Sequence, residues 1–152
     1  MSVTRAVAPY PQTWTCTTAQ IAASAPAGTV VSVSIVTDLS VGTSYSTVLI
    51  PPSQFLLIYD VYVTASPSVD FLVSFKVDNI QQGQNFGPVS QTLRSYGSGR
   101  LTMRNNPLLI RNSGLLSISA ITLAANGTSA ATESFTINVE YVPIGYRGPV
   151  VY

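Results

Sequence analysis

Large apolar side chains at every second position of residues 69–77, with Asp70, Ser74 and Lys76 on the other face, constrain the fold more than any other feature of the chain. Every second position there holds a large apolar residue: Val69, Phe71, Val73, Phe75 and Val77. Successive side chains of a strand point to opposite faces of a sheet, whereas a helix would scatter these five around its axis. The segment therefore predicts a strand with one face in a core.

The same period of two recurs over much of the chain. Residues 31–35, 116–120 and 135–141 alternate apolar with polar side chains, and residues 55–64 are apolar on both faces, as expected of a central strand. The turn residues between 55–64 and 69–77 predict an antiparallel hairpin. Shorter candidate strands lie at residues 43–50, 89–93, 100–103 and 108–111.

This pattern predicts an all-β protein. Eight or nine short strands, turn-rich joints and no convincing helix together indicate an antiparallel β-sandwich or barrel. A chain of 152 residues is near the commonest size for one domain, so we expect a single core.

The two ends depart from the alternation. Residues 1–28 are interrupted by three prolines and predict an extended N-terminal arm, and residues 143–152 predict an extended C-terminal tail. The sandwich domain would then span residues 29–142. We expect the aromatic side chains of the two ends to contact neighbouring molecules during assembly; these are Tyr10, Trp14, Tyr146 and Tyr152.

Charged residues are scarce. Lys and Arg number 7 and Asp and Glu number 6, which is 9% of the chain where an ordinary soluble domain carries about 25%. Charge keeps monomers apart in solution, so this surface is poorly protected against self-association. The net charge of +1 also lacks the strongly basic character of a dedicated nucleic-acid binder.

An acid-free segment carries most of the arginines. Residues 79–132 contain no Asp or Glu but hold Arg94, Arg100, Arg104 and Arg111. These guanidinium groups suit salt bridges with carboxylates of the same or an adjacent subunit, or contacts with phosphates of nucleic acid or lipid headgroups. If all four met DNA phosphates, log affinity would fall with log salt at a slope of about −3.6.

Catalytic and metal chemistry have little support in the sequence. The chain has no His, which removes the usual general base and the Ser–His–Asp and Cys–His arrangements. The lone Cys16 excludes an internal disulfide and is expected to be a small buried hydrophobe. We expect no enzyme activity, no metal, no cofactor and no small-molecule substrate.

Asn126, Gly127 and Thr128 match the N-glycosylation sequon. The same residues hold Asn-Gly, the favoured core of a tight hairpin turn, so we expect a turn, with glycosylation of Asn126 as the minor alternative. Residues 1–5 do not begin a secretory signal, and no apolar run is long enough to span a membrane. We therefore expect a protein made in the cytosol, the alternative being a signal that was removed before the first residue.

The aromatic arm, the eight or nine strands and the proline-bounded tail resemble single jelly-roll capsid proteins of icosahedral viruses. The resemblance is carried by the long strand patterns at residues 69–77, 115–123 and 134–142. It implies two four-stranded sheets packed face to face, loops that touch neighbours and terminal arms that join capsomers.

One feature narrows the resemblance. Many small RNA-virus coat proteins carry arms dense in Lys and Arg, whereas this arm carries Arg5 alone. The likeness therefore shifts toward DNA viruses with an internal membrane, and the composition is similar to that of virion proteins of thermophilic archaeal viruses.

The function implied by the resemblance is that of a self-assembling capsid subunit in a virion, whose partners are copies of itself and other virion proteins. Two alternatives remain open. One is a filament or surface-appendage subunit assembled by strand donation. The other is a carbohydrate-binding β-sandwich module that uses Tyr59, Tyr62 and Tyr96.

Overall fold

The structure, a computed structural model, describes residues 10–37, 42–63, 69–82, 86–89, 100–102 and 106–145, with the backbone alone at 86–89 and 100–102. These residues form strands and turns without a helix, which confirms the all-β prediction. Eleven strands are present where the sequence predicted eight or nine: β1 (Tyr10–Thr18), β2 (Val30–Val36), β3 (Thr47–Leu49), β4 (Gln54–Tyr62), β5 (Phe71–Val77), β6 (Ile80–Gln81), β7 (Phe86–Val89), β8 (Arg100–Thr102), β9 (Leu108–Ile110), β10 (Leu115–Thr122) and β11 (Ser134–Pro143).

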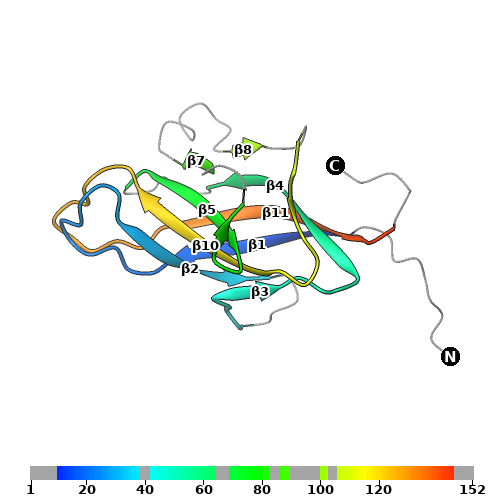
Figure 1. Ribbon diagram of the computed structural model, residues 1–152. Coiled ribbons are helices and arrows are strands. Elements are labelled where there is room, and N and C mark those ends of the chain that lie inside the picture. The colour runs from blue at the N-terminus through cyan, green and yellow to red at the C-terminus, as the bar shows by residue number, and fades with distance from the viewer. Residues whose placement is uncertain are drawn as a thin grey trace.

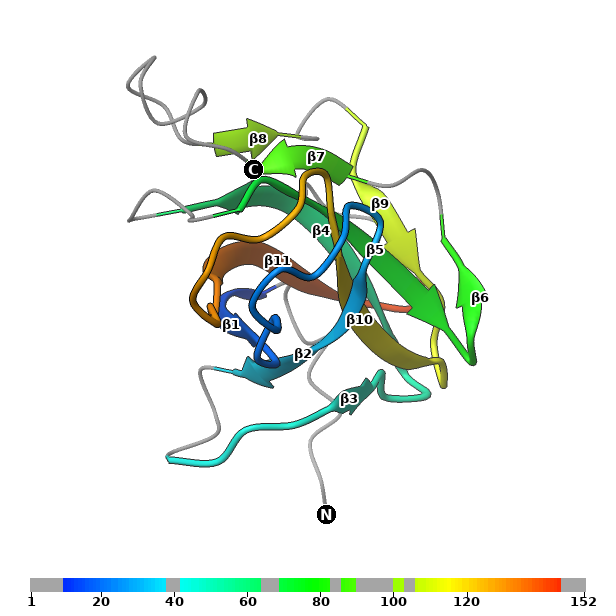
Figure 2. The same cartoon turned by 90° about the vertical axis from the view of Figure 1, so that its left-hand side faces the viewer.

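All eleven strands belong to one curled antiparallel sheet (Figure 1). The main strand order is β6-β5-β10-β2-β1-β11-β4-β8, and β3, β7 and β9 pair with β10, β5 and β4, respectively. Seen end-on, β2, β1, β11 and β4 curve around one side and β10 and β5 around the other (Figure 2). The curl gives the sheet an inner face that can enclose a core.

Strand β2 forms the corner of the curl. Its residues 30–32 pair with β10, and its residues 33–36 pair with β1. One strand therefore belongs to both sides of the molecule, and the sheet stays continuous around this corner.

The core lies inside the curl and is built from the alternating positions. The inward side chains of β5, β10 and β11 are buried as the sequence predicted. Trp14, Phe71, Phe75 and Phe135 are the bulkiest fully buried side chains, and the rings of Phe71 and Phe135 are tilted with centroids 5.6 Å apart. Each of these aromatic side chains removes a large apolar area from water on folding.

The predicted N-terminal arm is wrong for residues 10–28. Residues 10–18 form β1, which lies between β2 and β11 in the middle of the sheet, and Trp14 and Cys16 are 0% exposed. Further along, Ile21 is buried and bridges to Ala131. A strand with partners on both sides has its backbone hydrogen bonds satisfied, so this segment is part of the fold. Residues 1–9 and 146–152, with the other predicted tail contacts Tyr146 and Tyr152, lie outside the described residues.

The predicted hairpin between residues 55–64 and 69–77 is also wrong. Strand β4 pairs with β11, β8 and β9, whereas β5 pairs with β10, β6 and β7. The two strands are consecutive in the sequence, but each is a central strand with neighbours of its own.

Candidate interaction surfaces

The outer face of β2, β1 and β11 is an ordered array of hydroxyl and methyl groups, here called the threonine face. It consists of Thr13, Thr15, Thr17, Ser34, Val36, Ser134, Thr136 and Asn138. In register, Thr15 lies between Val36 and Thr136, and Thr17 lies between Ser34 and Ser134. Neighbouring side chains in such rows are about 4.7–4.9 Å apart between strands and roughly 6.6–6.8 Å apart along a strand.

None of the residues that make up the threonine face is charged, and the two carboxylates next to it, Asp60 and Glu140, are buried. Thr13 and Asn138 are joined across it by a hydrogen bond of 3.3 Å between side chains. Short β-branched side chains lose little conformational entropy when they are covered, and hydroxyl groups can donate and accept. The face can therefore be buried against a similar surface without the cost of desolvating ions.

Large apolar side chains are exposed elsewhere on the sheet. Leu49 of β3 and Leu115 of β10 are register partners and are 62% and 41% exposed. Ile80, next to the β5–β6 turn, is 68% exposed. Paired exposed leucines are an apolar patch of the kind that contacts between proteins cover.

A groove lies at the end of the curl where β1 begins and β11 ends, here called the tyrosine groove. Its volume is about 260 Å³, and it is lined by Tyr10, Gln12, Thr37, Tyr45, Thr47, Val48, Leu49, Pro51 and Tyr141. The rings of Tyr10 and Tyr141 stack with centroids 5.2 Å apart and an interplanar angle of 21°. Tyr45 is the most open of the three tyrosines, with 43% of its surface exposed.

Gln12 is held in one orientation beside the groove. Its side-chain Oε1 accepts a hydrogen bond of 2.8 Å from the indole Nε1 of Trp14, and the residue is only 7% exposed. An indole N–H can only donate, so the amide oxygen must face Trp14. The amide Nε2 of Gln12, with two N–H donors, has no acceptor among the described residues.

Burial changes the acidity of two groups, Tyr141 of β11 and Cys16 of β1. Desolvation, with a smaller contribution from Tyr10, raises the pKa of Tyr141 to about 12, so its phenol stays protonated at neutral pH. Desolvation also raises the pKa of Cys16 well above its ordinary value, and the thiol is free and buried. Cys16 is thus an unreactive core side chain, as the sequence predicted.

Two buried carboxylates lie beyond the threonine face, on β4 and β11. Tyr59 Oη donates to Glu140 Oε1 at 2.9 Å, and Asn138 Nδ2 donates to Asp60 Oδ2 at 2.9 Å. Asp60 and Glu140 are both 0% exposed. Nowhere in the described ranges do three or more potential metal ligands of the His, Cys, Asp and Glu types come together.

The carbohydrate-binding set predicted from the sequence does not form an open site. Tyr59 is 3% exposed and hydrogen-bonded to Glu140, and Tyr62 is half-buried. Tyr96 lies outside the described residues. The structure instead places three other tyrosines around the tyrosine groove, and no sequence motif marked them.

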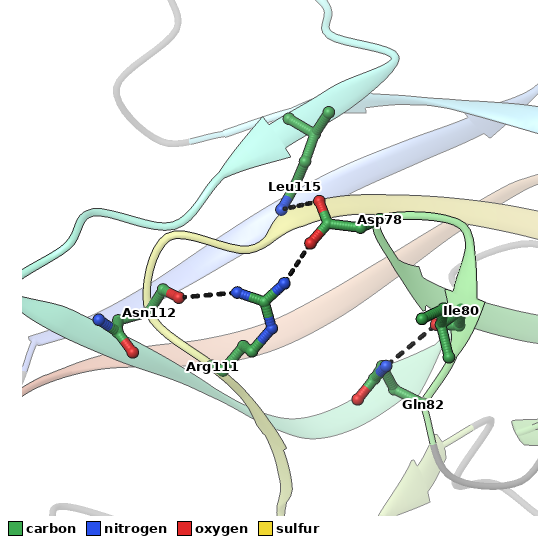
Figure 3. A network of polar contacts seen from close by, with 6 residues as sticks. All are labelled: Asp78, Ile80, Gln82, Arg111, Asn112 and Leu115. Carbon is green, nitrogen blue, oxygen red and sulfur yellow. Dashed lines mark hydrogen bonds and ion pairs between the residues drawn. The ribbon is translucent and has the colours of Figure 1, made fainter.

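Arg111 is the only residue of the predicted arginine patch whose side chain the structure describes. It forms an ion pair with Asp78 and donates to the backbone oxygen of Asn112 at 3.2 Å (Figure 3). Asp78 also accepts from the backbone N–H of Leu115 at 3.3 Å. This pairing within the chain matches the carboxylate alternative for Arg111.

The structure describes less of the other three arginines of the patch. Arg100 is in β8, where the register sets it opposite Tyr62 of β4 and the backbone alone is described. Arg94 and Arg104 lie outside the described residues. The phosphate alternative for these three residues therefore stays a prediction.

Asn126 has a structural role that the sequon did not suggest. Its Nδ2 donates to the backbone oxygens of Ile21, Ala22 and Ser129 at 3.3, 2.9 and 3.0 Å, and its Oδ1 accepts from the N–H of Gly127. The predicted tight hairpin is wrong, because β10 and β11 are not paired with each other. A glycan on Nδ2 would break these contacts, so glycosylation is incompatible with this geometry.

Comparison with known proteins finds no matching protein family and no match among curated proteins. In the part of the chain that the structure describes, no helix has the length and apolar character needed to cross a membrane. Functional inference therefore depends on the surfaces described above.

Proposed function

We propose that this chain is a jelly-roll structural subunit that assembles with copies of itself into the shell of an icosahedral virion. The observation that carries the proposal is the threonine face, an accessible outer surface formed by three adjacent strands, whose neighbouring carboxylates Asp60 and Glu140 are buried. Surfaces of this kind have little to keep copies apart and much to gain from mutual burial.

The strand order supports the jelly-roll part of the proposal. Without the short strands β3, β6 and β9, eight strands remain, which in chain order are β1, β2, β4, β5, β7, β8, β10 and β11. Their pairings give two four-stranded rows, β1-β11-β4-β8 and β2-β10-β5-β7. In chain order these are first-eighth-third-sixth and second-seventh-fourth-fifth, which matches the wiring of a jelly roll with its two Greek keys.

The distribution of charge supports the assembly part. Of 13 charged side chains, Asp60, Glu133 and Glu140 are buried, which leaves at most ten for an accessible surface of 8330 Å². Subunits of closed shells bury a large part of their surface against neighbours around symmetry axes. A surface with so few ions loses little solvation on such contact.

The filament alternative is less favoured by the same geometry. Strand donation needs a terminal segment that can leave its own chain and complete a neighbour's sheet. Strand β1 is already paired on both sides within its own chain.

The proposed shell subunit would work in the virion after synthesis in the host cytoplasm, beside other virion proteins.

The test is to place one charge in the threonine face. Purified parent protein should form closed particles in negative-stain images and in sedimentation analysis. We expect Thr15→Lys to keep the β-sheet circular dichroism spectrum and to sediment as a small species, because each contact would bury an unpaired ammonium group. Thr128→Lys makes the same replacement in an exposed loop between β10 and β11 and should assemble like the parent.

Two results would count against the proposal. One is a parent protein that stays monomeric at high concentration, and the other is a Thr15→Lys variant that assembles as well as the Thr128→Lys control.

A further inference from the structure

The tyrosine groove has the chemical character of a small-molecule site, and it is separate from the threonine face. Gln12 and Tyr141 point to the inner side of the sheet, whereas Thr13 and Thr15 point to the outer side. Its volume of about 260 Å³ is just below the roughly 300–1,000 Å³ of pockets that hold drug-sized ligands. The groove therefore suits a ligand of about one ring.

The lining of the groove selects for a neutral ligand. None of the nine lining residues carries a charge, and Tyr141 keeps its proton at neutral pH. An ionic ligand would lose its hydration in the groove without gaining a counter-charge. An uncharged ligand meets no such cost.

The lining also combines flat apolar surfaces with hydrogen-bonding groups. Tyr45, at 43% exposure, offers a ring surface to a ligand, and the stacked pair of Tyr10 and Tyr141 forms another part of the wall. Thr37 and Thr47, which carry hydroxyl groups, belong to the same lining. A sugar ring has the matching character, because its C–H groups form an apolar face and its rim carries hydroxyl groups.

Gln12 supplies the most specific contact. The hydrogen bond from Trp14 fixes its amide oxygen, and the amide Nε2 is left with two N–H donors on a residue that is only 7% exposed. The Nε2 atom is not one of the fully buried polar atoms that lack a partner, so a ligand oxygen in the groove can reach it and accept from it. A hydroxyl or ring oxygen of a sugar is a suitable acceptor.

We propose that the tyrosine groove binds a neutral sugar ring, with Tyr45 as the stacking surface and the Gln12 amide as the hydrogen-bond donor. A proline-rich peptide fits less well. It needs a long groove, since a polyproline helix advances about 3.1 Å per residue, and its prolines offer acceptors without donors. Sugar binding by this groove does not depend on whether the chain assembles into a shell.

The experiment is saturation-transfer difference NMR on the full chain, which also works with large assemblies. The probes are the neutral methyl glycosides of glucose, galactose, mannose and N-acetylglucosamine, with glucuronate as the anionic ligand and a hexaproline peptide as the peptide ligand. We expect at least one neutral glycoside to receive saturation mainly at the C–H protons of one ring face. Glucuronate and hexaproline should receive none.

Three variants locate the site. Tyr45→Ala should weaken binding by about tenfold, whereas Tyr45→Phe keeps the ring and should bind nearly as the parent does. Gln12→Glu keeps an oxygen for Trp14 but removes the N–H donors, so it should also weaken binding. Leu109→Ala is the matched control, because Leu109 is an exposed apolar residue outside the groove, and its affinity should not change.

The proposal would be overturned by any of three results. These are no saturation transfer to any neutral glycoside, binding that Tyr45→Ala leaves unchanged, and binding of hexaproline in place of the sugars. Tyr45 is exposed, so its variants should fold even where Gln12→Glu does not.

Discussion

Replacement of Trp14 by Ala tests whether β1 belongs to the core. Trp14 is 0% exposed, its indole N–H donates to Gln12, and its ring lies 6.3 Å from that of Tyr141. Truncation of a buried aromatic residue to Ala costs about 3–5 kcal/mol, and loss of the hydrogen bond adds about 1 kcal/mol. We expect the free energy of unfolding to fall by about 4–6 kcal/mol.

A loss of this size is a large part of the roughly 5–15 kcal/mol that stabilises a typical domain. With a urea dependence of about 2 kcal/mol per molar, the unfolding midpoint should fall by about 2–3 M. Trp14→Phe keeps an aromatic ring and loses the indole N–H, so it should fall between the parent and Trp14→Ala.

The assay is urea unfolding followed by far-ultraviolet circular dichroism, because removal of Trp14 also removes the only tryptophan. Two protein concentrations about tenfold apart would reveal any stabilisation by association. The matched control is Thr13→Ala, one position along β1 on the exposed face, and its cost should stay within about 0.5–1 kcal/mol. A Trp14→Ala midpoint within about 0.5 M of the parent would refute the placement of β1 in the core.

Further predictions concern pH, thiol chemistry and two loop contacts. Burial raises the pKa of Tyr141 from 10.0 to about 12 in the folded state, so its contribution to stability is complete below pH 10 and is lost as pH rises toward 12. In thermal melts over this alkaline range, the Tyr141→Phe variant should therefore lose stability less steeply than the parent protein. The thiol of Cys16 should react with a maleimide only at the rate of unfolding, which mass spectrometry can follow, and fast labelling of folded protein would contradict its burial. Asn126→Ala should lower the free energy of unfolding in urea by about 1–3 kcal/mol, because three carbonyl oxygens lose a donor. When the parent protein is secreted from eukaryotic cells, Asn126 should carry no glycan, and a glycosylated protein of equal stability would contradict the described contacts. Arg111→Ala should cost less than about 1 kcal/mol, since its ion pair with Asp78 is largely exposed, and a larger loss that persists in high salt would show a role beyond that pair.

Alternation predicted the strands whose inner residues are large and apolar. Phe71, Phe75 and Phe135 mark β5 and β11 clearly, and both strands are present as expected. Strand β1 escaped prediction because its inner face carries Gln12, Cys16 and Thr18 beside the aromatic residues Tyr10 and Trp14. The available signal was a β-branched Thr at three successive outward positions, 13, 15 and 17, because this residue type favours strands.

The surfaces were harder to predict than the strands. The tyrosine groove joins residues from 10–12, 45–51, Thr37 and Tyr141, which meet because β1 pairs with both β11 and β2 and because Tyr45 bridges to Ile35 of β2. The threonine face needs the register of three strands, and register depends on the pairing of the whole sheet. Charge scarcity indicated that some surface would be covered, but it could not say which one.

The pairing of the first described strand with the last sets the order of events during synthesis. Tyr10 lies opposite Tyr141, so β1 obtains one of its two partners only when β11 has left the ribosome. Until then the nascent chain carries the indole of Trp14 without the packing that β11 supplies. Such distant pairing is slow and leaves apolar surface open to wrong contacts. The core therefore cannot be finished before β11 has been synthesised, and the docking of β11 against β1 is the step that completes it.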